Sequence, residues 1–311
     1  MIPRMELHLA KPRGFCAGVE RAIEIVEKAL AQFGAPIYVR HEIVHNAVVV
    51  EELKAKGAVF VDDLDLVPAG SWLIFSAHGV PPHVVETAKK RELQVIDATC
   101  PLVTKVHLEA RHFAQNQATI LLVGHRNHVE VEGVVGEAPD SILVIESPEE
   151  AEEVQVPDPD KVAVLTQTTL SVDEARAVID VLRRRFPKLA LPHKDDICYA
   201  TQNRQDAVRR LAPSIDLLLV IGDKTSSNSN RLRELGESLG VPSKLLLSSA
   251  ELREEWFEGV RRIGITSGAS TPEVSVEEVM QALAERGVQT TRVLDHPGEG
   301  LTFSLPELLR H

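Results

Sequence analysis

The chain has 311 residues, of which 44% are hydrophobic and 26% charged, as is ordinary for a globular protein of about two domains. Its formal net charge of −12 at pH 7 argues against a broad nucleic-acid-binding surface. No window reaches the roughly 18 apolar residues of a membrane-spanning helix, and the first residues show no secretory signal. We therefore expect a cytoplasmic protein that binds neither membranes nor nucleic acids.

Short apolar runs alternate with amphipathic stretches along the whole chain. In chain order, the strand candidates are Ile37–Arg40, Trp72–Ser76, Thr119–Val123, Val162–Thr166, Leu217–Ile221 and Ile263–Thr266. An apolar period of about 3.6 residues predicts helices between them, as over Val19–Leu30 and Val172–Arg185. Alternation of this kind is typical of βαβ units, so we predict an α/β protein with mostly parallel sheets.

The alternation repeats three times, and each repeat starts at a cysteine that is followed by a helix, a strand and a polar turn. The turns are HEIVHN (41–46), GHRNHVE (124–130) and GDKTSSNSN (222–230). A polar residue of each turn comes at a nearly constant distance after the cysteine: His45 is 29 residues after Cys16, His128 is 28 after Cys100 and Ser227 is 29 after Cys198. Matched spacing predicts three lobes of similar construction.

A second polar turn ends another strand of each repeat: SAHG (76–79), TQTT (166–169) and TSGAS (266–270). We assign lobe 1 to residues 1–98, lobe 2 to 99–195 and lobe 3 to 196–286, with a C-terminal strand and tail at 287–311. Ligands of parallel α/β sheets bind at the carboxyl ends of the strands, where all six turns lie. Three lobes pointing these ends inward would form a trefoil around one central cavity. Three unrelated α/β domains in a row are the alternative.

Cys16, Cys100 and Cys198 each stand just before a predicted helix. A helix N-terminus favours the thiolate, which is the form that binds iron. An odd number of cysteines fits no disulfide framework, and close cysteine pairs typical of structural zinc are absent from the sequence. Three equivalent thiols therefore favour one iron–sulfur cluster with an open iron. Inert buried thiols and a Cys₃His zinc site remain alternatives.

The polar turns offer many hydrogen-bond donors and few permanent charges, which suits a phosphate or diphosphate group. The candidate substrate-binding residues are His45, His78, His128, Thr168, Thr169, Ser226, Ser227, Asn228 and Ser270. Those at 226–228 could equally be helix caps. Glu130 is the candidate proton donor, with Glu132 as the fallback. Residues two apart on a helix point in nearly opposite directions, so Glu130 and His128 converge only if the helix begins after His128 or the stretch is irregular.

Together these motifs resemble the 4-hydroxy-3-methylbut-2-enyl diphosphate reductases, the LytB-type iron–sulfur reductases of the non-mevalonate isoprenoid pathway. The resemblance runs from residue 13 to about residue 285 and is looser after Asp295. The segments that carry it are RGFCAGV (13–19), HEIVHN (41–46), SAHGVP (76–81), DATCP (97–101), GHRNHVEVEG (124–133), TQTTLS (166–171), DICYATQNRQ (196–205), SSNSNRL (226–232) and SGAS (267–270).

The resemblance implies a trefoil around a 4Fe-4S cluster with Cys16, Cys100 and Cys198 as ligands. It implies that the substrate hydroxyl approaches the open iron near the catalytic residues Thr168 and Glu130, with Glu130 relaying protons. Electrons would come one at a time from ferredoxin or flavodoxin, and the products would be isopentenyl and dimethylallyl diphosphate. The diphosphate would be held by His45, His78, His128, Ser226, Ser227, Asn228 and Ser270.

Three other functions are compatible with the same residues. An aconitase-like hydro-lyase acting on a phosphorylated substrate would use an open iron without net redox, so dependence on a reductant separates it from a reductase. An iron–sulfur sensor would need a nucleic-acid surface, which the net charge disfavours. A zinc hydrolase would be recognised by metal analysis.

Overall fold

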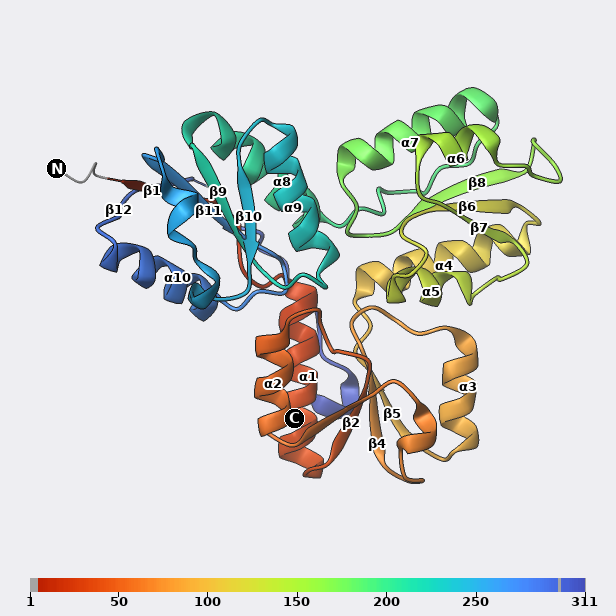
Figure 1. The fold of residues 1–311 in the computed structure, drawn as a ribbon. Coiled ribbons are helices and arrows are strands. Elements are labelled where there is room, and N and C mark those ends of the chain that lie inside the picture. Colours follow the sequence, from red (N-terminus) through yellow and green to blue (C-terminus); the bar gives the residue numbers. More distant parts are fainter. Residues whose placement is uncertain (1–4, 296–297, 311) are drawn as a thin grey trace. The chain divides into compact units, whose positions relative to one another are not determined.

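The protein is described by a computed structural model that covers residues 5–295 and 298–310 (Figure 1). The chain divides into two compact units that interleave along the sequence. The first unit contains the residues up to Ala17, His45–Val49 and Tyr199–Leu301; the second contains Gly18–Val44, Val50–Cys198 and the residues from Thr302. Of the helices described, none is both long and apolar enough to cross a membrane.

The first unit is built on one parallel sheet with the strand order β10-β9-β11-β1-β12. Its strands are β1 (Glu6–Leu9), β9 (Leu217–Ile221), β10 (Ser243–Leu246), β11 (Arg262–Ser267) and β12 (Gln289–Val293). Its helices are α8 (Tyr199–Leu211), α9 (Ser227–Ser238) and α10 (Glu273–Glu285). In Figure 1, α8 and α9 cover one face of this sheet and α10 covers the other.

The apolar run of β9 explains why both faces of this sheet are covered. Successive side chains of a strand point to opposite faces, and all five residues of β9 are buried. Leu217 and Leu219 pack in a cluster with Val276 of α10, while Leu218 packs with Leu232 of α9. A strand that is apolar on both sides needs helices on both sides, which is the usual state of a parallel sheet.

The second unit contains two further parallel sheets, with the orders β3-β2-β4-β5 and β7-β6-β8. The strands are β2 (Ile37–Arg40), β3 (Ala58–Val61), β4 (Trp72–Phe75), β5 (Gln94–Asp97), β6 (Thr119–Val123), β7 (Ile142–Ile145) and β8 (Val162–Thr166). The helices are α1 (Ala17–Phe33), α2 (Ala47–Ala55), α3 (Pro82–Lys90), α4 (Pro101–Gln115), α5 (Val129–Val135), α6 (Pro148–Glu153) and α7 (Val172–Arg185).

Around the second of these sheets, α6 and α7 share one apolar cluster, and α4 and α5 share another. Short 3-10 helices complete the fold: η1 (Leu64–Leu66), η2 (Ala212–Ser214), η3 (Ser249–Glu251), η4 (Glu254–Phe257) and η5 (Glu307–Leu309).

The prediction of an α/β fold with parallel sheets is confirmed. Each of the six predicted strands is present within one residue at either end, and α7 spans the predicted range Val172–Arg185. One strand lies elsewhere than expected. The assignment of residues 1–98 to lobe 1 includes β1, whereas β1 pairs between β11 and β12 in the sheet of the first unit. The trefoil arrangement around a central cavity stays a prediction.

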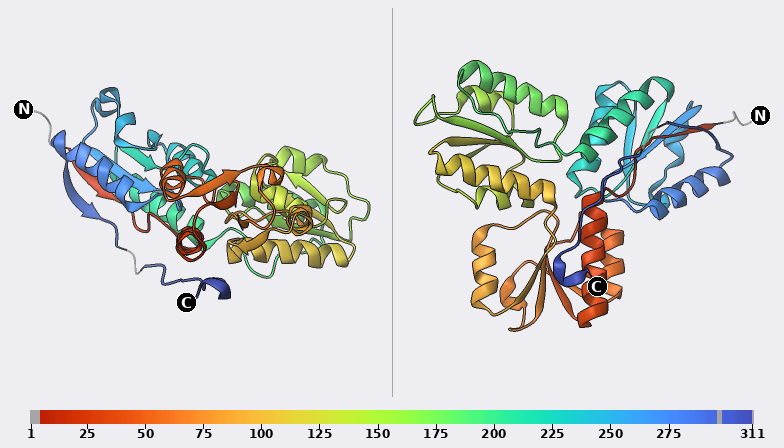
Figure 2. Two further views of the ribbon diagram at one scale, coloured as in Figure 1. Left: turned by 90° about the horizontal axis from the view of Figure 1, so that it is seen from below. Right: turned by 180° about the vertical axis from the view of Figure 1, so that it is seen from behind.

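The C-terminal tail returns to α1 in the second unit. Arg21 of α1 donates through Nε to the carbonyl oxygen of Ser304 at 2.8 Å, and Leu309 of η5 is fully buried. Both views in Figure 2 show this last segment alongside α1. The tail therefore stabilises the helix that begins directly after Cys16.

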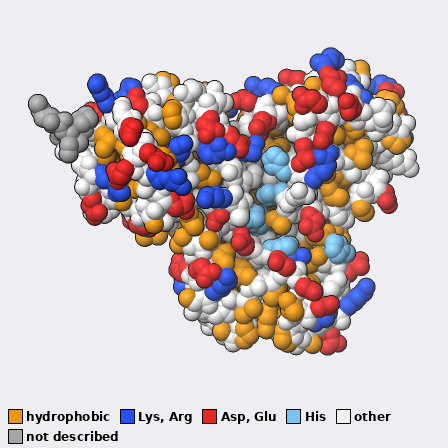
Figure 3. Space-filling model, in the orientation of Figure 1, with side chains coloured by type: hydrophobic (Ala, Val, Ile, Leu, Met, Phe, Trp, Pro, Cys, Tyr) orange, Lys and Arg blue, Asp and Glu red, His pale blue; other side chains and the backbone are white. Residues whose placement is uncertain are grey.

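Charged side chains of both signs are interspersed on the face shown in Figure 3. Many are paired locally, as where Arg126 contacts both Glu146 and Glu150. These neighbours raise the pKa of Arg126, mainly through the hydrogen bond to Glu150. Such mixed charge is typical of a solvated surface rather than of a surface that attracts phosphate backbones.

Candidate functional site

The three cysteines share one local geometry. Each precedes a helix, and its backbone N–H donates to the carbonyl oxygen of the residue two positions beyond the end of a parallel strand. The pairs are Cys16 with Ala269 after β11 (3.1 Å), Cys100 with Ala77 after β4 (3.0 Å) and Cys198 with Thr168 after β8 (3.0 Å). Every acceptor belongs to one of the second polar turns of the repeat. The equivalence predicted from spacing thus extends to the backbone hydrogen bond that holds each cysteine.

The chemistry of these residues fits an iron–sulfur cluster. None of the three cysteines is in a disulfide, and all three are partly exposed and placed at helix starts, where the partial positive charge favours a thiolate. Cys16 lies in the first unit, and Cys100 and Cys198 lie in the second. That the three bind one cluster stays a prediction.

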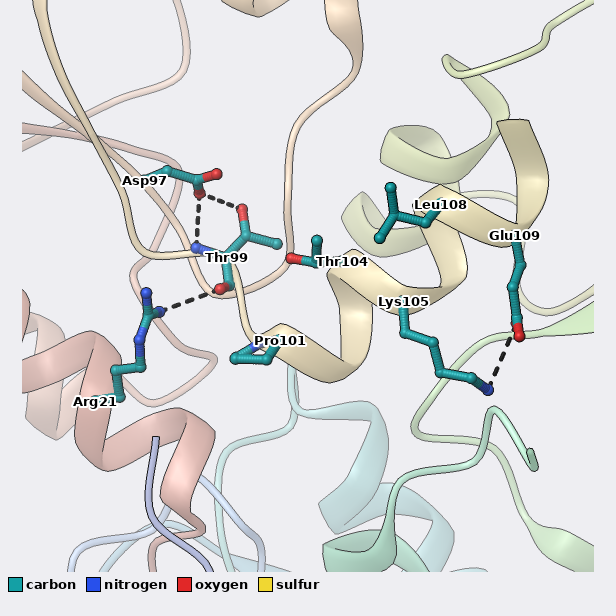
Figure 4. Close-up of a pocket in the computed structure, with 8 residues that line it drawn as sticks. All are labelled: Arg21, Asp97, Thr99, Pro101, Thr104, Lys105, Leu108 and Glu109. Atoms are coloured by element: carbon teal, nitrogen blue, oxygen red, sulfur yellow. Dashed lines mark hydrogen bonds and ion pairs between the residues drawn. The ribbon is translucent and has the colours of Figure 1, made fainter. Parts of the chain in front are cut away.

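The turn before Cys100 is held by side chains from two elements (Figure 4). Asp97 at the end of β5 accepts hydrogen bonds from the backbone N–H and the hydroxyl of Thr99. Arg21 donates to the carbonyl oxygens of Ala98 and Thr99 at 3.2 and 3.1 Å. Arg21, Asp97 and Thr99 line a cavity of about 430 Å³ whose wall continues along the first turns of α4. The backbone that leads into Cys100 is therefore held by hydrogen bonds from both sides.

An ion pair with a buried carboxylate fixes the segment before Cys198. Lys105 of α4 donates to Asp196 Oδ1 at 2.8 Å, and Asp196 Oδ2 accepts the backbone N–H of Thr166 at 2.9 Å. The Asp196 carboxyl is completely buried. Burial raises the pKa of Asp196 to about 7, although Lys105 opposes the rise. The pair ties α4, the end of β8 and the Cys198 segment together.

A buried arginine holds the segment before Cys16. Arg204 of α8 is fully buried and donates to the carbonyl oxygen of Gly14 at 2.7 Å. Glu299 neutralises it at 3.1 Å, as a buried guanidinium requires. The backbone N–H of Gly14 in turn donates to Ser267 of β11 at 2.7 Å. Both sides of this glycine are therefore anchored within the first unit.

His128 and Glu130 meet because the helix begins between them. α5 starts at Val129, and His128 is its N-cap with an extended backbone. The backbone N–H of Glu130 donates to His128 Nδ1 at 3.1 Å. Because Nδ1 accepts this bond, the proton of a neutral imidazole resides on Nε2, which is then a donor. The condition for convergence stated from the sequence is met.

The Glu130 carboxylate lies against Thr168 and is only 2% exposed. Oε1 accepts the backbone N–H of Thr168 at 2.6 Å, and Oε2 accepts its hydroxyl at 2.8 Å. The carbonyl of the same threonine accepts the N–H of Cys198. Glu132, the fallback candidate, is exposed. The geometry therefore favours Glu130 over Glu132 as a group that acts near Cys198.

Two neighbouring turns add further candidate residues in the second unit. The rings of His78 and His128 lie with centroids 6.0 Å apart at 83° to one another. Thr169 accepts a hydrogen bond from Gln167 Nε2 at 2.9 Å, while Gln167 Oε1 accepts the backbone N–H of His125 at 3.0 Å. The side chain of Gln167 thus joins the TQTT turn to the GHRNH turn.

In the first unit, Ser226 is the N-cap of α9. Its hydroxyl accepts the backbone N–H of Ser229 at 3.3 Å, so the capping role considered from the sequence is present. Asn228 is different, because it is 4% exposed and neither polar atom of its amide has a hydrogen-bond partner among the described residues. Buried amides without partners are uncommon, and one beside a helix N-terminus can bind an anion.

The His45 turn is fixed in the same unit by two side chains. Ser270 donates its hydroxyl to the carbonyl oxygen of His45 at 2.9 Å. Asp223 accepts the backbone N–H groups of Ala47 and Thr225, both at 2.9 Å. Burial alone would raise the pKa of Asp223, but these hydrogen bonds outweigh it and hold the pKa below its ordinary value.

The structure gathers the candidates into one set within each unit. The second unit holds His78, His128, Glu130, Thr168 and Thr169, and the first holds His45, Ser226, Ser227, Asn228 and Ser270. Sequence reasoning missed the residues that fix these turns, namely Gln167, Asp196, Arg204 and Asp223. A signal was available, because each lies inside a motif already singled out, but a buried polar partner is not visible in a linear pattern.

Comparisons with known proteins agree over nearly the whole chain. The family model described as LytB protein matches residues 7–284. A 4-hydroxy-3-methylbut-2-enyl diphosphate reductase of Azoarcus sp. is 56% identical over 305 residues, 98% of each chain. One of Acidothermus cellulolyticus is 56% identical over 310 residues, 99% of this chain and 91% of that protein. The structure of the E-1-hydroxy-2-methyl-but-2-enyl-4-diphosphate reductase from Plasmodium falciparum matches with a TM-score of 0.95 and 39% identity, covering 99% of this chain and 97% of that one.

Proposed function

The chain belongs to the LytB family, and we propose that it reduces (E)-4-hydroxy-3-methylbut-2-enyl diphosphate to isopentenyl and dimethylallyl diphosphate. Cys16, Cys100 and Cys198 would hold the 4Fe-4S cluster that this reaction needs. One observation supports the proposal most strongly. Thr168 donates two hydrogen bonds to the buried Glu130 carboxylate and accepts one from the N–H of Cys198. The residue we propose as proton carrier is thereby joined through one residue to a cysteine that we propose as a cluster ligand.

The reaction removes a hydroxyl group from an allylic carbon. The C–O bond breaks, the carbon skeleton takes up two electrons and one proton, and the hydroxyl takes up a second proton to leave as water. When bound, the cluster would supply electrons and an open iron that acts as a Lewis acid on oxygen. The reaction also needs a positioned acid and a binding site for the diphosphate, and the protein's own side chains and backbone must supply both.

Glu130 is placed to handle the protons. Its carboxylate is held by two hydrogen bonds, so it can donate or accept a proton without moving. The Thr168 hydroxyl points its hydrogen at Glu130 Oε2, which leaves its oxygen lone pairs to accept the hydrogen of a substrate hydroxyl. For the hydroxyl to leave as water, both hydrogen bonds must then reverse: a protonated Glu130 donates to the Thr168 oxygen while the Thr168 hydroxyl donates its hydrogen to the substrate oxygen.

The diphosphate would be bound by neutral donors and one helix terminus. His128 presents Nε2–H, since its Nδ1 is occupied by the backbone of α5. Asn228 presents a buried amide at the start of α9, where helix N–H groups already favour an anion. Neutral donors of this kind bind a diphosphate less tightly than arginine or lysine would, because the donor brings no charge of its own, and this favours release of the product.

The test is anaerobic reconstitution with iron and sulfide, followed by turnover of the allylic diphosphate with a ferredoxin or flavodoxin system. We expect a brown protein that forms both products only when the electron donor is reduced. Water loss without a reductant would instead indicate a hydro-lyase, and bound zinc without iron would indicate a hydrolase. Either result would refute the proposed reduction.

A further inference from the structure

His107 lies in the middle of α4, outside every polar turn, and is nevertheless only 6% exposed. Its Nδ1 lies 2.8 Å from Oε1 of Glu137, whose side chain is 8% exposed. An ionised carboxylate can only accept, so Nδ1 is the donor. Glu137 is itself held by Arg111, whose Nε lies 3.6 Å away. This pair locks the orientation of the imidazole ring.

The opposite edge of the ring faces two glycines. A Cβ placed on Gly79 would lie 2.9 Å from His107 Nε2, and one placed on Gly133 would lie 3.2 Å from the same atom. Gly79 also has a φ of +79°, which side chains rarely adopt. Among the described residues, Nε2 has no hydrogen-bond partner. On this side the imidazole is therefore a spacer between two backbones.

Those two backbones carry three of the candidate residues of the second unit. Gly79 directly follows His78, and Gly133 lies in α5, the helix that His128 caps and that contains Glu130. The same segments touch again where a Cβ on Gly136 would lie 2.2 Å from Cβ of Pro81. The SAHG turn and α5 thus lie close together, and the His107 imidazole packs against the backbones of both.

We infer that His107 is a positioning residue that sets the separation of His78 from His128 and Glu130, with Glu137 fixing its ring. The consequence for the substrate rests on the proposed function, because only then do the two histidines bind one diphosphate. The separation itself does not rest on it. His107 belongs to none of the polar turns, so it acts through its neighbours.

The experiment compares the full-length protein with His107→Ala, Gly133→Ala and the double variant, using His112→Ala as the control. His112 is exposed on the same helix. Histidine-¹⁵N-labelled protein gives imidazole signals for His78 and His128, which His78→Gln and His128→Gln assign. We expect His107→Ala and Gly133→Ala each to shift both signals and His112→Ala to shift neither. The Gly133→Ala effect should vanish in the His107→Ala background, since the crowded ring is then absent.

Gly133→Ala keeps His107 and a helical backbone, so it tests the spacing even if His107→Ala does not fold. In the reconstituted enzyme, KM for the allylic diphosphate should rise about tenfold in His107→Ala, with a smaller change in kcat. A wild type that neither binds nor reduces the diphosphate would contradict the proposed function alone. Unchanged His78 and His128 signals in His107→Ala and Gly133→Ala would overturn the spacing inference alone.

Discussion

Thr168 links Glu130 to Cys198 through its three polar groups. Its backbone N–H and its hydroxyl donate to Glu130, and its carbonyl oxygen accepts the N–H of Cys198. Glu130→Gln keeps the volume of the side chain and one acceptor but removes the ionisable group. We expect kcat to fall by about 10²- to 10⁴-fold, the usual contribution of a positioned acid or base. Iron content and melting temperature should stay near those of the wild type. Glu132→Gln, at an exposed position, is the matched control; equal losses in both variants would contradict the proton role of Glu130.

Asp223 gives a pH-dependent prediction. Its pKa in the folded protein lies below the ordinary value of 3.8, because backbone N–H groups of Thr225 and Ala47 outweigh burial. The stability it contributes is therefore fully present above about pH 4 and is lost as the pH falls through the lower, folded-state pKa. Asp223→Asn should cost about 1 kcal/mol at pH 7, a modest figure because the side chain is only half-buried. Melting curves from pH 7 to 3 should show the two proteins converging at the acidic end; a constant difference would contradict this account.

At the scale of elements, the start of α9 combines a cap with a candidate binding site. Ser226→Ala removes the bond to the N–H of Ser229 and should destabilise the protein by about 1 kcal/mol. Ser147 caps α6 through Glu150 in the same way but lies in no candidate turn, so Ser147→Ala is the control. Ser226→Ala should lower the melting temperature at least as much as Ser147→Ala, since Ser226 also accepts the hydroxyl of Ser229, and only Ser226→Ala should weaken diphosphate binding measured by calorimetry. Equal affinity of Ser226→Ala and Ser147→Ala for the diphosphate would show that Ser226 caps the helix without binding the substrate.

Elements with strong apolar patterns were predictable, and the weaker ones were not. β9 and α7 have long runs whose burial is decided locally, so their limits follow from the sequence. β1 has four residues, and its place between β11 and β12 depends on a pairing some 250 residues distant. The residue at which α5 begins could not be predicted either, because its histidine N-cap depends on a single hydrogen bond between the ring and the backbone. Local patterns determine which segments are strands and helices, while distant partners determine where short ones lie.

At the scale of the whole molecule, the threefold repeat makes the candidate site recognisable in the sequence. Equal spacing identifies the cysteines and turns as equivalent, and the shared hydrogen bond to a residue two beyond a strand end supports that equivalence. What spacing cannot supply is the set of buried partners that hold each turn. Asp196 does this before Cys198, Arg204 before Cys16 and Asp223 at the His45 turn, each by a different arrangement. The geometry of the repeat is shared, whereas the means of fixing it differs from one turn to the next.

The equivalence leads to a prediction about the cysteines as a set. Each is held by its backbone N–H, is partly exposed and precedes a helix, so changing its side chain leaves the local hydrogen bond in place. Cys16→Ser, Cys100→Ser and Cys198→Ser should therefore keep the wild-type far-ultraviolet circular dichroism. Each should lose most of the iron and the visible absorbance after anaerobic reconstitution, because a neutral hydroxyl is a poor ligand for iron. If one variant retained full iron and turnover while the others did not, the three thiols would not be equivalent ligands of one cluster, and the threefold interpretation of the sequence would be wrong.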